Sequence, residues 1–510
     1  MVRKIIFVII SILCAYIPSV FAIQPRLSII VSLCKERNLL AGLIADLTKQ
    51  TIFPQCELLL IGSKEYNCTT DIAPYLQTFE NIRFICMKGS FDEIDLINCA
   101  IEQAKAPFLV KVNGGDTHLA DAFQKKVSEL ESNEIIDVIY SDYWWSNEPH
   151  KQAQQCKKTD ISILPAFNSS LFSVALPGPE PMWRKSIHSR FGYFEKNFTY
   201  KNEWAFWKKI SYKNGYFKKM AQPDMVHFIS IADTKTANYS SKIVAILDEE
   251  QAIMNMYSID YPKAASQKPM VIIVPSYNNA LWSKRNLDSL FMQHYENYRI
   301  IYINDASTDD TDFLVRNYVM LNHQNHRFTY IKNSERKGCP LANICYALSL
   351  CRPEEIAVIM DGDDWFAHEN VLPYLNDVYQ DPNVWLTYGQ FAVFPFEMVG
   401  WGHEVPQAIL KENKIRKYHW VTSHLRTFYV RLFSHIKIED LILDGRFFPM
   451  AGDLALMFPL VELAGVHTRF IPEILYIYNR ANALNEDKVN KALQSQCESA
   501  ARNGAIYKPL

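Results

Sequence analysis

The sequence lacks a basic excess, closely spaced cysteine pairs and low-complexity stretches, and each absence excludes a class of protein. Its 53 lysines and arginines are balanced by 55 aspartates and glutamates, so a net charge of −2 gives no basic field for nucleic acid. The eleven cysteines include no Cys-x-x-Cys pair. Cys339, Cys345 and Cys351 recur at six-residue steps that do not share one helix face, so no cysteine metal centre is expected. Disulfides remain an alternative if the chain is exported.

The N-terminus has the pattern of a targeting segment. Arg3 and Lys4 precede an apolar core from Ile5 to Ile17, and Val20-Phe21-Ala22 is typical of a signal-peptidase exit. The pattern predicts a signal peptide over residues 1–22. The alternative is an uncleaved anchor, because residues 5–22 contain no charge and just reach spanning length. Either way we expect an exported or membrane-associated protein.

An apolar run followed by three carboxylates is the most informative stretch. Ile356 to Met360 is typical of a buried parallel strand, and Asp361-Gly362-Asp363-Asp364 follows at once. Strand ends are where open α/β sheets bind ligands. Carboxylates this close repel one another, and a divalent cation with all-oxygen ligation, Mg²⁺ or Mn²⁺, removes that repulsion. The alternative is an acidic turn that precedes a helix.

The segment before it predicts a βαβ unit. Residues 269–279 form an apolar strand that ends in a polar loop, and residues 298–311 form a second strand that ends in an acidic, hydroxyl-rich turn. A stretch of helical spacing separates them. Strand, helix and strand in this order indicate half of a nucleotide-binding sheet, with Asp305 at its ligand-binding edge.

Three motifs in order resemble a known enzyme family. They are Pro275-Ser276-Tyr277-Asn278, Asn304-Asp305-Ala306-Ser307-Thr308-Asp309 and Asp361-Gly362-Asp363-Asp364. At βαβ spacing they resemble the family-2 inverting glycosyltransferases of GT-A fold, over residues 268–480. The resemblance implies a metal-assisted enzyme that moves a sugar from a nucleotide-sugar donor, expected to be UDP-linked, to a hydroxyl of a glycan, lipid or protein.

The resemblance also implies roles for single residues. Mn²⁺ or Mg²⁺ is expected on Asp361, Asp363 and His424, with Asp364 as a supporting residue or an alternative ligand. The nucleotide-sugar is expected to contact Pro275, Tyr277, Asn278, Asp305, Lys337, Asp361 and Arg426. The family often has an arginine where this chain has Ala342, so Lys337 or Arg336 is expected to replace that contact, and a solvated basic turn is the alternative. Alternatives stay open for Asp305 as a turn former and for His424 as a structural histidine.

Inversion requires a base on the face of the sugar opposite the leaving group. Asp453 stands where the family's acidic residue opens a helix, and it is the expected catalytic base. The alternative is an N-capping aspartate. Glu439, Asp440 and Asp444 are further candidates in a segment that has the composition of an exposed linker.

The chain also contains a candidate repeat. At 510 residues it is long enough for two to four domains, and an ungapped offset of 243 places Ile29 on Ile272 and Gly62 on Asp305. Further on, outside that offset, Asn113-Gly114-Gly115-Asp116 resembles the acidic motif and keeps one carboxylate of three. Glu203 before a tryptophan is a candidate base in this half, which we expect to be structural or acceptor-binding.

These observations predict two tandem α/β domains of GT-A type with mostly parallel sheets. The expected bounds are a degenerate domain over 23–260, a linker over 261–269, a catalytic domain over 270–485 and a tail over 486–510. The alternative function is a non-catalytic protein that binds glycans or nucleotide-sugars. A nucleotidyltransferase, which shares the metal logic, would need a glycine-rich, basic first loop, and residues 275–278 provide neither.

Overall fold

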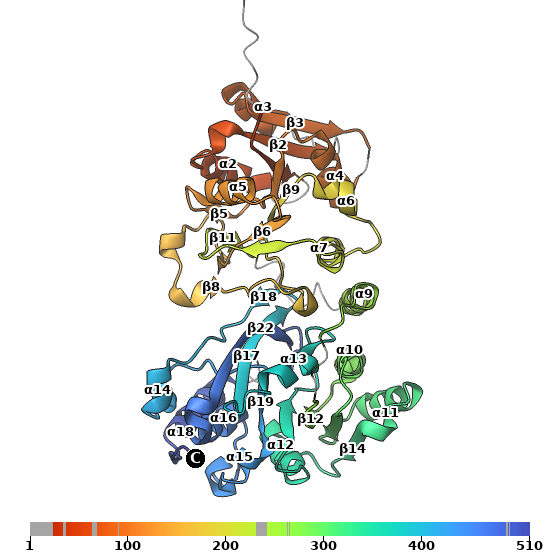
Figure 1. Ribbon diagram of the computed structural model, residues 1–510, viewed down its shortest axis with the longest axis vertical. Coiled ribbons are helices and arrows are strands. Elements are labelled where there is room, and N and C mark those ends of the chain that lie inside the picture. Colours follow the sequence, from red (N-terminus) through yellow and green to blue (C-terminus); the bar gives the residue numbers. More distant parts are fainter. Residues whose placement is uncertain are drawn as a thin grey trace, which may run out of the picture.

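The computed structural model describes residues 24–510 except 34–36, 64–68, 90, 231–241, 263, 265, 486, 487 and 489. The segment 1–22, for which a signal peptide or anchor is predicted, lies outside the described residues. Two α/β bodies are stacked along the long axis, with the N-terminal half above and the C-terminal half below in Figure 1. Within the described part of the chain, no helix combines the length and apolar character that a bilayer crossing requires.

The N-terminal body is built on a seven-stranded sheet in the order β10-β6-β9-β4-β1-β2-β3. These strands are β1 (Leu27–Ser32), β2 (Cys56–Ser63), β3 (Ile82–Met87), β4 (Phe108–Lys111), β6 (Val138–Tyr140), β9 (Met182–Arg184) and β10 (Phe217–Lys219). A second sheet contains β5 (Thr117–His118), β11 (Met225–Phe228), β7 (Tyr143–Ser146) and β8 (Ile161–Ser162). The helices are α2 (Leu40–Leu47), α3 (Thr69–Thr78), α4 (Glu93–Gln103), α5 (Ala122–Ser132), α6 (Ile187–Phe191), α7 (Asn202–Tyr212) and α9 (Ile243–Met256).

The C-terminal body is built on one nine-stranded sheet in the order β14-β13-β12-β15-β19-β17-β22-β16, with β18 paired to β17. These strands are β12 (Met270–Ser276), β13 (Tyr298–Asn304), β14 (Phe328–Lys332), β15 (Ile356–Ile359), β16 (Trp365–Phe366), β17 (Leu386–Phe394), β18 (Met398–Val399), β19 (Arg426–Tyr429) and β22 (Thr468–Asn479); β20 (Ile442–Leu443) and β21 (Arg446–Phe447) form a separate hairpin. The helices are α10 (Ala280–Phe291), α11 (Thr311–Leu321), α12 (Pro340–Ser349), α13 (Val371–Val378), α14 (Gln407–Lys411), α15 (Val430–Phe433), α16 (Gly452–Ala464) and α18 (Lys491–Arg502). β12 is buried at every position, as a parallel strand covered on both faces should be.

The two main sheets match strand by strand. Read from β3 and from β14, both place the strands in the same sequence order, and the direction of every neighbouring pair agrees through the seventh strand. The small N-terminal sheet matches too, because β5, β11, β7 and β8 pair as β16, β22, β17 and β18 do. The difference is that β17 and β22 are long enough to join both parts into one sheet.

The register corrects one expected correspondence. Ile29 lies opposite Leu58, whereas Ile272 lies opposite Ile300, so the offset falls from 243 on the first strand to 242 on the second. Gly62 therefore corresponds to Asn304, and the residue that corresponds to Asp305 is the one after Gly62. An ungapped offset missed this because the loops before the second strand differ by one residue.

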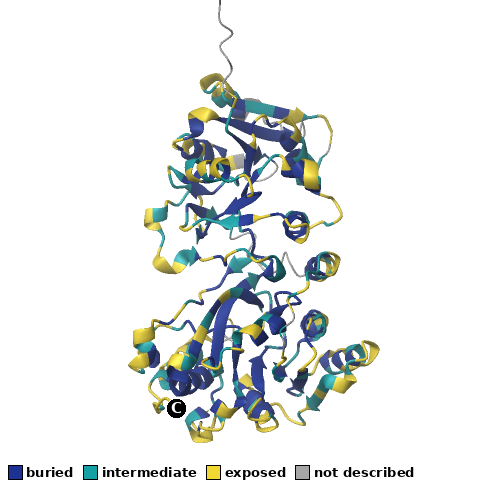
Figure 2. Ribbon diagram, viewed as in Figure 1, coloured by how far each residue is buried: buried dark blue, intermediate teal, exposed yellow. Residues whose placement is uncertain are grey.

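The two bodies share a core. One apolar cluster contains Ile253 and Phe206 from the N-terminal half together with Trp282, Trp365 and Phe394 from the C-terminal half. Figure 2 shows buried residues along the strands of both bodies. Because a single cluster crosses the boundary, we expect the two bodies to be held in a fixed relative position.

The segment 486–510 was predicted to be a peripheral tail, but its helix α18 packs on the C-terminal body. Cys497 and Ala501 of α18 are buried in the core of the C-terminal body. Arg416 donates to both carboxylate oxygens of Glu462 on α16 and to the carbonyl of Ala505. The polar composition predicted a peripheral segment, but α18 is amphipathic, and its narrow apolar face packs on α16.

Candidate active site

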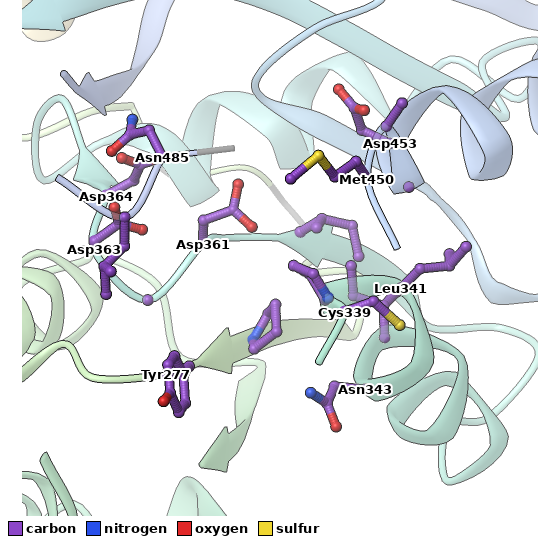
Figure 3. A pocket seen from close by; sticks show the side chains of 18 of the residues that line it. Tyr277, Cys339, Leu341, Asn343, Asp361, Asp363, Asp364, Met450, Asp453 and Asn485 are labelled. Carbon is purple, nitrogen blue, oxygen red and sulfur yellow. The ribbon is translucent and has the colours of Figure 1, made fainter. Parts of the chain in front are cut away.

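A cavity of about 820 Å³ lies at the carboxyl ends of β12, β13 and β15. Its lining includes the loops that follow these strands, the start of α16 and the end of β22. This is the edge at which open α/β sheets bind ligands. In Figure 3, Asp361 lies between Tyr277 on one side and Asp453 on the other, with Asp363 and Asp364 beside it. The structure thus gathers the predicted residues of all three motifs around one space.

The acidic turn is held close to the first strand. The N–H of Gly362 donates to the carbonyl of Pro275 at 3.1 Å, and the side chain of Asn286 donates to the carbonyls of Asp361 and Asp364. A Cβ at position 362 would lie 2.6 Å from Cβ of Ser276. Glycine is therefore required here, because the turn must approach β12 this closely to present its carboxylates to the cavity.

The three carboxylates have different surroundings. Asp364 is buried and accepts from the hydroxyl of Tyr476 at 2.5 Å and from the N–H of Asn479 at 2.7 Å. Asp363 accepts from the side chain of Asn482 at 2.6 Å, and burial raises the pKa of Asp363 to about 6. Burial and then the two neighbouring carboxylates raise the pKa of Asp364 well above its usual value. This clustering of desolvated acids is the situation that a bound cation relieves.

The side chains that converge on a common point are Asp361, Asp364 and His424, whose ligand atoms lie within 4.8 Å of one another. The sequence predicted Asp361, Asp363 and His424, with Asp364 as an alternative ligand; in this convergence Asp364 takes the place of Asp363. Burial, then Arg426, lowers the pKa of His424 well below its usual value, which keeps the ring neutral. Its acceptor nitrogen, Nδ1, receives a hydrogen bond from Arg426, and a cation bound at Nδ1 would displace that bond. The residues fit a hard divalent ion with one nitrogen ligand.

Arg426 connects the acidic turn to the predicted base. Its guanidinium is buried, with Nη2 3.4 Å from Oδ2 of Asp361 and Nη1 3.3 Å from Oδ2 of Asp453. Nη2 also donates to Nδ1 of His424 at 3.1 Å. The predicted nucleotide-sugar contact is therefore in the cavity, where it orients a metal candidate and the base candidate together.

Asp453 is the second residue of α16, and the residue at the N-cap is Ala451, in a left-handed conformation without a side-chain cap. Oδ1 of Asp453 accepts from the N–H of Leu454, and Oδ2 faces Arg426. Asp453 therefore does not occupy the N-cap position, although it accepts from one N–H of the first turn. Burial raises the pKa of Asp453 and Arg426 opposes that rise, so this carboxylate is more basic than an exposed aspartate.

The predicted donor end is built from the first two motifs. Pro275, Tyr277, Asn278 and Asp305 all line the cavity. The side-chain oxygen of Asn278 accepts from the N–H of Thr308 at 2.8 Å, which fixes the two loops to each other. Both oxygens of Asp305 accept from the chain, Oδ1 from Asn333 and the N–H of Lys337 and Oδ2 from the N–H of Gly338.

Lys337 is the predicted contact that the structure does not place in the cavity lining. Its backbone N–H binds Asp305, whereas its side chain is exposed; the neighbouring Arg336 lines the cavity instead. Arg336, the other basic residue considered from the sequence, is therefore a basic side chain that lines the donor end of the cavity. Adjacent residues of an extended loop point in opposite directions, which a sequence pattern does not resolve.

Several cavity residues carried no prediction. They are Asn279, Arg480, Asn482, Asn485, Gln494 and Glu498. A signal for half of them was present, since the apolar strand that ends at Asn479 is followed by a run rich in asparagine and arginine. Gln494 and Glu498 come from α18, and nothing local to that segment indicates a site.

A carboxylate cluster, a histidine and an aspartate at a helix start therefore meet at the ligand-binding edge of a mostly parallel sheet. Comparison with family models gives the class directly: residues 271–439 match the model of glycosyl transferase family 2. The C-terminal half therefore contains a family-2 glycosyltransferase domain of GT-A fold, and the three motifs of the cavity lie inside the matched range.

Two curated relatives cover much of the chain. An uncharacterized glycosyltransferase of Rickettsia bellii is 22% identical over 391 residues, which span 68% of this chain and 54% of that protein. A second, from Rickettsia felis, is 20% identical over 68% of this chain and 62% of that protein. The chain thus spans little more than half the length of these relatives.

Solved structures resemble parts of the chain at low identity. TarS 1–349 of S. aureus, solved in complex with UDP-GlcNAc, is 16% identical with a TM-score of 0.36, covering 47% of this chain and 68% of that one. The mannosyltransferase PcManGT of Pyrobaculum calidifontis, in complex with GDP-Man and Mn²⁺, is 18% identical with a TM-score of 0.34, covering 53% and 77%.

Proposed function

We propose that the C-terminal body transfers a sugar from a UDP-sugar to a hydroxyl acceptor with inversion at the anomeric carbon. The observation that carries the proposal is Arg426, which holds Asp361 of the acidic turn and Asp453 of α16 on two sides of one cavity. In an inverting transfer, the acceptor hydroxyl must approach the anomeric carbon from the face opposite the one from which the diphosphate leaves. This cavity provides a cation-accepting side at Asp361 and, at Asp453, a side with the candidate catalytic base.

The reaction follows from these residues. Asp453 accepts the proton of the acceptor hydroxyl while the hydroxyl oxygen forms a bond to the anomeric carbon. The bond from that carbon to the diphosphate oxygen breaks, and its electron pair leaves with the diphosphate. Asp361, Asp364 and His424 would hold Mn²⁺ or Mg²⁺, which neutralises the charge of a diphosphate when bound. Arg426 keeps both carboxylates oriented and reduces their mutual repulsion.

The N-terminal body, we further propose, is a degenerate copy of the same fold. The matching strand order supports this, and so does one shared contact: Asp116 accepts from the N–H of Phe228 at 2.7 Å, as Asp364 does from Asn479. Its site is filled from within, because Glu203, the second residue of α7, pairs with Lys111 at the end of β4. We assign this half a structural role, with residues 1–22 serving export or anchoring.

The test is nucleotide release by the full chain with Mn²⁺ and a panel of UDP- and GDP-sugars. Release with one donor is expected, and Asp453→Asn should lower it about 10²- to 10⁴-fold. The matched control is Asp444→Asn, which removes an exposed carboxylate from a turn outside the cavity lining and should leave release unchanged. Retention of release in Asp453→Asn would contradict the assignment of the base.

A non-catalytic nucleotide-sugar-binding protein is the second candidate. It is favoured by the carboxylate of Asp305, whose two oxygens already accept three hydrogen bonds from the chain, and by Ala342 at the position of the family's arginine. If the chain binds a nucleotide-sugar but releases no nucleotide from any donor of the panel, this second function would be supported.

A further inference from the structure

The donor end of the cavity contains a stacked pair that no motif predicts. Cζ of Arg336 lies 3.7 Å from the centroid of the Tyr277 ring, and both residues line the cavity. This separation is direct van der Waals contact, so no second ring fits between guanidinium and phenol. The face of the Tyr277 ring on this side is therefore covered by the chain itself.

The loop that carries Arg336 is fixed at its base. Asp305 accepts from the N–H groups of Lys337 and Gly338, at 2.8 and 3.0 Å, and from the side chain of Asn333. Gly338 has a φ of +74°, which lets the chain turn back immediately after this anchor. The side chain of Arg336, in contrast, is exposed. It can thus rotate about its own bonds while its backbone stays in place.

We propose that Arg336 is a nucleobase cap: it covers Tyr277 in the empty site and moves to the outer face of the base once the base stacks on Tyr277. The proposal rests on the nucleotide-sugar function above. Physical terms favour the exchange, because an exposed cation–π pair is weak, whereas a base gains stacking on each of its two faces. A guanidinium suits the outer face, since it is planar and weakly hydrated.

This role differs from a contact to the diphosphate of the donor. Tyr277 lies away from Asp453, on the far side of Asp361 (Figure 3), so the stacked pair is at the end of the cavity remote from the base candidate. A cap on the base should affect ligands that contain a nucleobase and leave a bare diphosphate untouched.

The test is calorimetric titration of the full chain, in Mn²⁺, with UDP and separately with inorganic pyrophosphate. Arg336→Ala should weaken UDP binding about tenfold and leave pyrophosphate binding unchanged. Arg336→Lys should behave as Arg336→Ala, because an ammonium keeps the charge and loses the planar face. Arg316→Ala, which removes an exposed arginine of α11 outside the cavity lining, is the matched control and should bind both ligands as the unsubstituted chain does.

The outcomes separate the cap from the function on which it rests. If the unsubstituted chain binds neither UDP nor pyrophosphate, the proposed function and the cap both fall. If it binds UDP and Arg336→Ala binds equally well or more tightly, only the cap falls. Equal loss of UDP and pyrophosphate, or recovery by lysine, would make Arg336 a phosphate ligand and would also overturn the cap.

Discussion

Nη1 of Arg426 lies 3.3 Å from Oδ2 of Asp453, so a guanidinium that enters the cavity from β19 reaches the first turn of α16. The same guanidinium lies 3.4 Å from Asp361. The buried guanidinium of Arg426 therefore couples the acidic turn to the candidate catalytic base. Removal of its charge should alter stability, donor turnover and the titration of Asp453 at once.

Arg426→Gln tests this coupling. Because the substitution leaves two partly buried carboxylates without their cation, we expect the free energy of unfolding to fall by about 3 kcal/mol. Arg426 lowers the pKa of Asp453, so its loss should raise that pKa and shift the acid limb of the rate profile to higher pH. Urea unfolding and nucleotide release against pH measure both. Arg352→Gln removes an exposed arginine and serves as control; an unshifted acid limb in Arg426→Gln would contradict the coupling.

Gly362→Ala tests the close approach of the acidic turn to β12. The added Cβ would lie 2.6 Å from Cβ of Ser276 and 2.8 Å from the side-chain nitrogen of Asn279, so the turn must move away. We expect a loss of about 1–3 kcal/mol of stability and weaker Mn²⁺ binding, measured by unfolding and by titration with the metal alone.

The control is Gly445→Ala in the β20–β21 hairpin, where φ is +79° and a Cβ would meet nothing within 4 Å. This variant pays only the backbone cost of a left-handed conformation, about 1–2 kcal/mol, and should bind Mn²⁺ normally. Equal Mn²⁺ affinity in both variants would show that the turn tolerates displacement.

The cavity's location could be predicted from the sequence because it depends on local pattern. A buried apolar run specifies a parallel strand, and the residues directly after it must lie at the ligand-binding edge, which placed Asp305, Asp361 and Tyr277 correctly. The resemblance to the family placed Asp453 at the start of a helix, and the structure has it in the first turn of α16 and in the cavity lining.

What could not be predicted depends on distant partners. Asp364 rather than Asp363 joins Asp361 and His424 because Tyr476 and Asn479, more than 100 residues later, hold its carboxylate. The turn itself allows either direction. The contribution of α18 to the cavity was missed for the same reason, since its composition is that of a solvated helix and only its packing on α16 places it there.

The buried triad around His118 makes the stability of the N-terminal body depend on pH. Nδ1 of His118 lies 2.6 Å from Asp46, and Nε2 lies 2.9 Å from Glu180. Burial alone would lower the pKa of His118, but Glu180 and Asp46 outweigh it and raise that pKa to about 10. Since the folded-state pKa exceeds the unfolded value near 6.5, the contribution is complete below pH 6.5 and is lost as pH rises toward 10.

We therefore expect the stability difference between the unsubstituted chain and His118→Gln to be largest near pH 6 and to shrink steadily up to pH 9.5. Urea unfolding at several pH values measures it, and the difference between the two proteins cancels other titrating groups. His326→Gln, at an exposed histidine of the C-terminal body, should show no such trend. A difference that grows with pH would mean that His118 is neutral in the folded state.

The interface between the two bodies contains a buried cation whose removal should affect both. Lys201, from the N-terminal body, pairs with Glu397 in the turn between β17 and β18, and its Nζ lies 2.8 Å from Oε1 of Glu250 on α9. All three groups lie beside the apolar cluster that the bodies share. Lys201→Met leaves two carboxylates buried without their cation, which should cost about 3–5 kcal/mol.

Because the shared core links the bodies, we expect one cooperative unfolding transition whose midpoint moves as a whole. Tryptophan fluorescence, with reporters in both halves, follows it in urea. Lys213→Met, at an exposed position after α7, is the control and should change little. The double variant Lys201→Met/Glu397→Met should recover most of the lost stability. In it the carboxylate of Glu397 is absent, and Glu250 still has Arg285 at 3.8 Å as a partner. Two separate transitions, or no recovery in the double variant, would mean that the bodies fold independently of this contact.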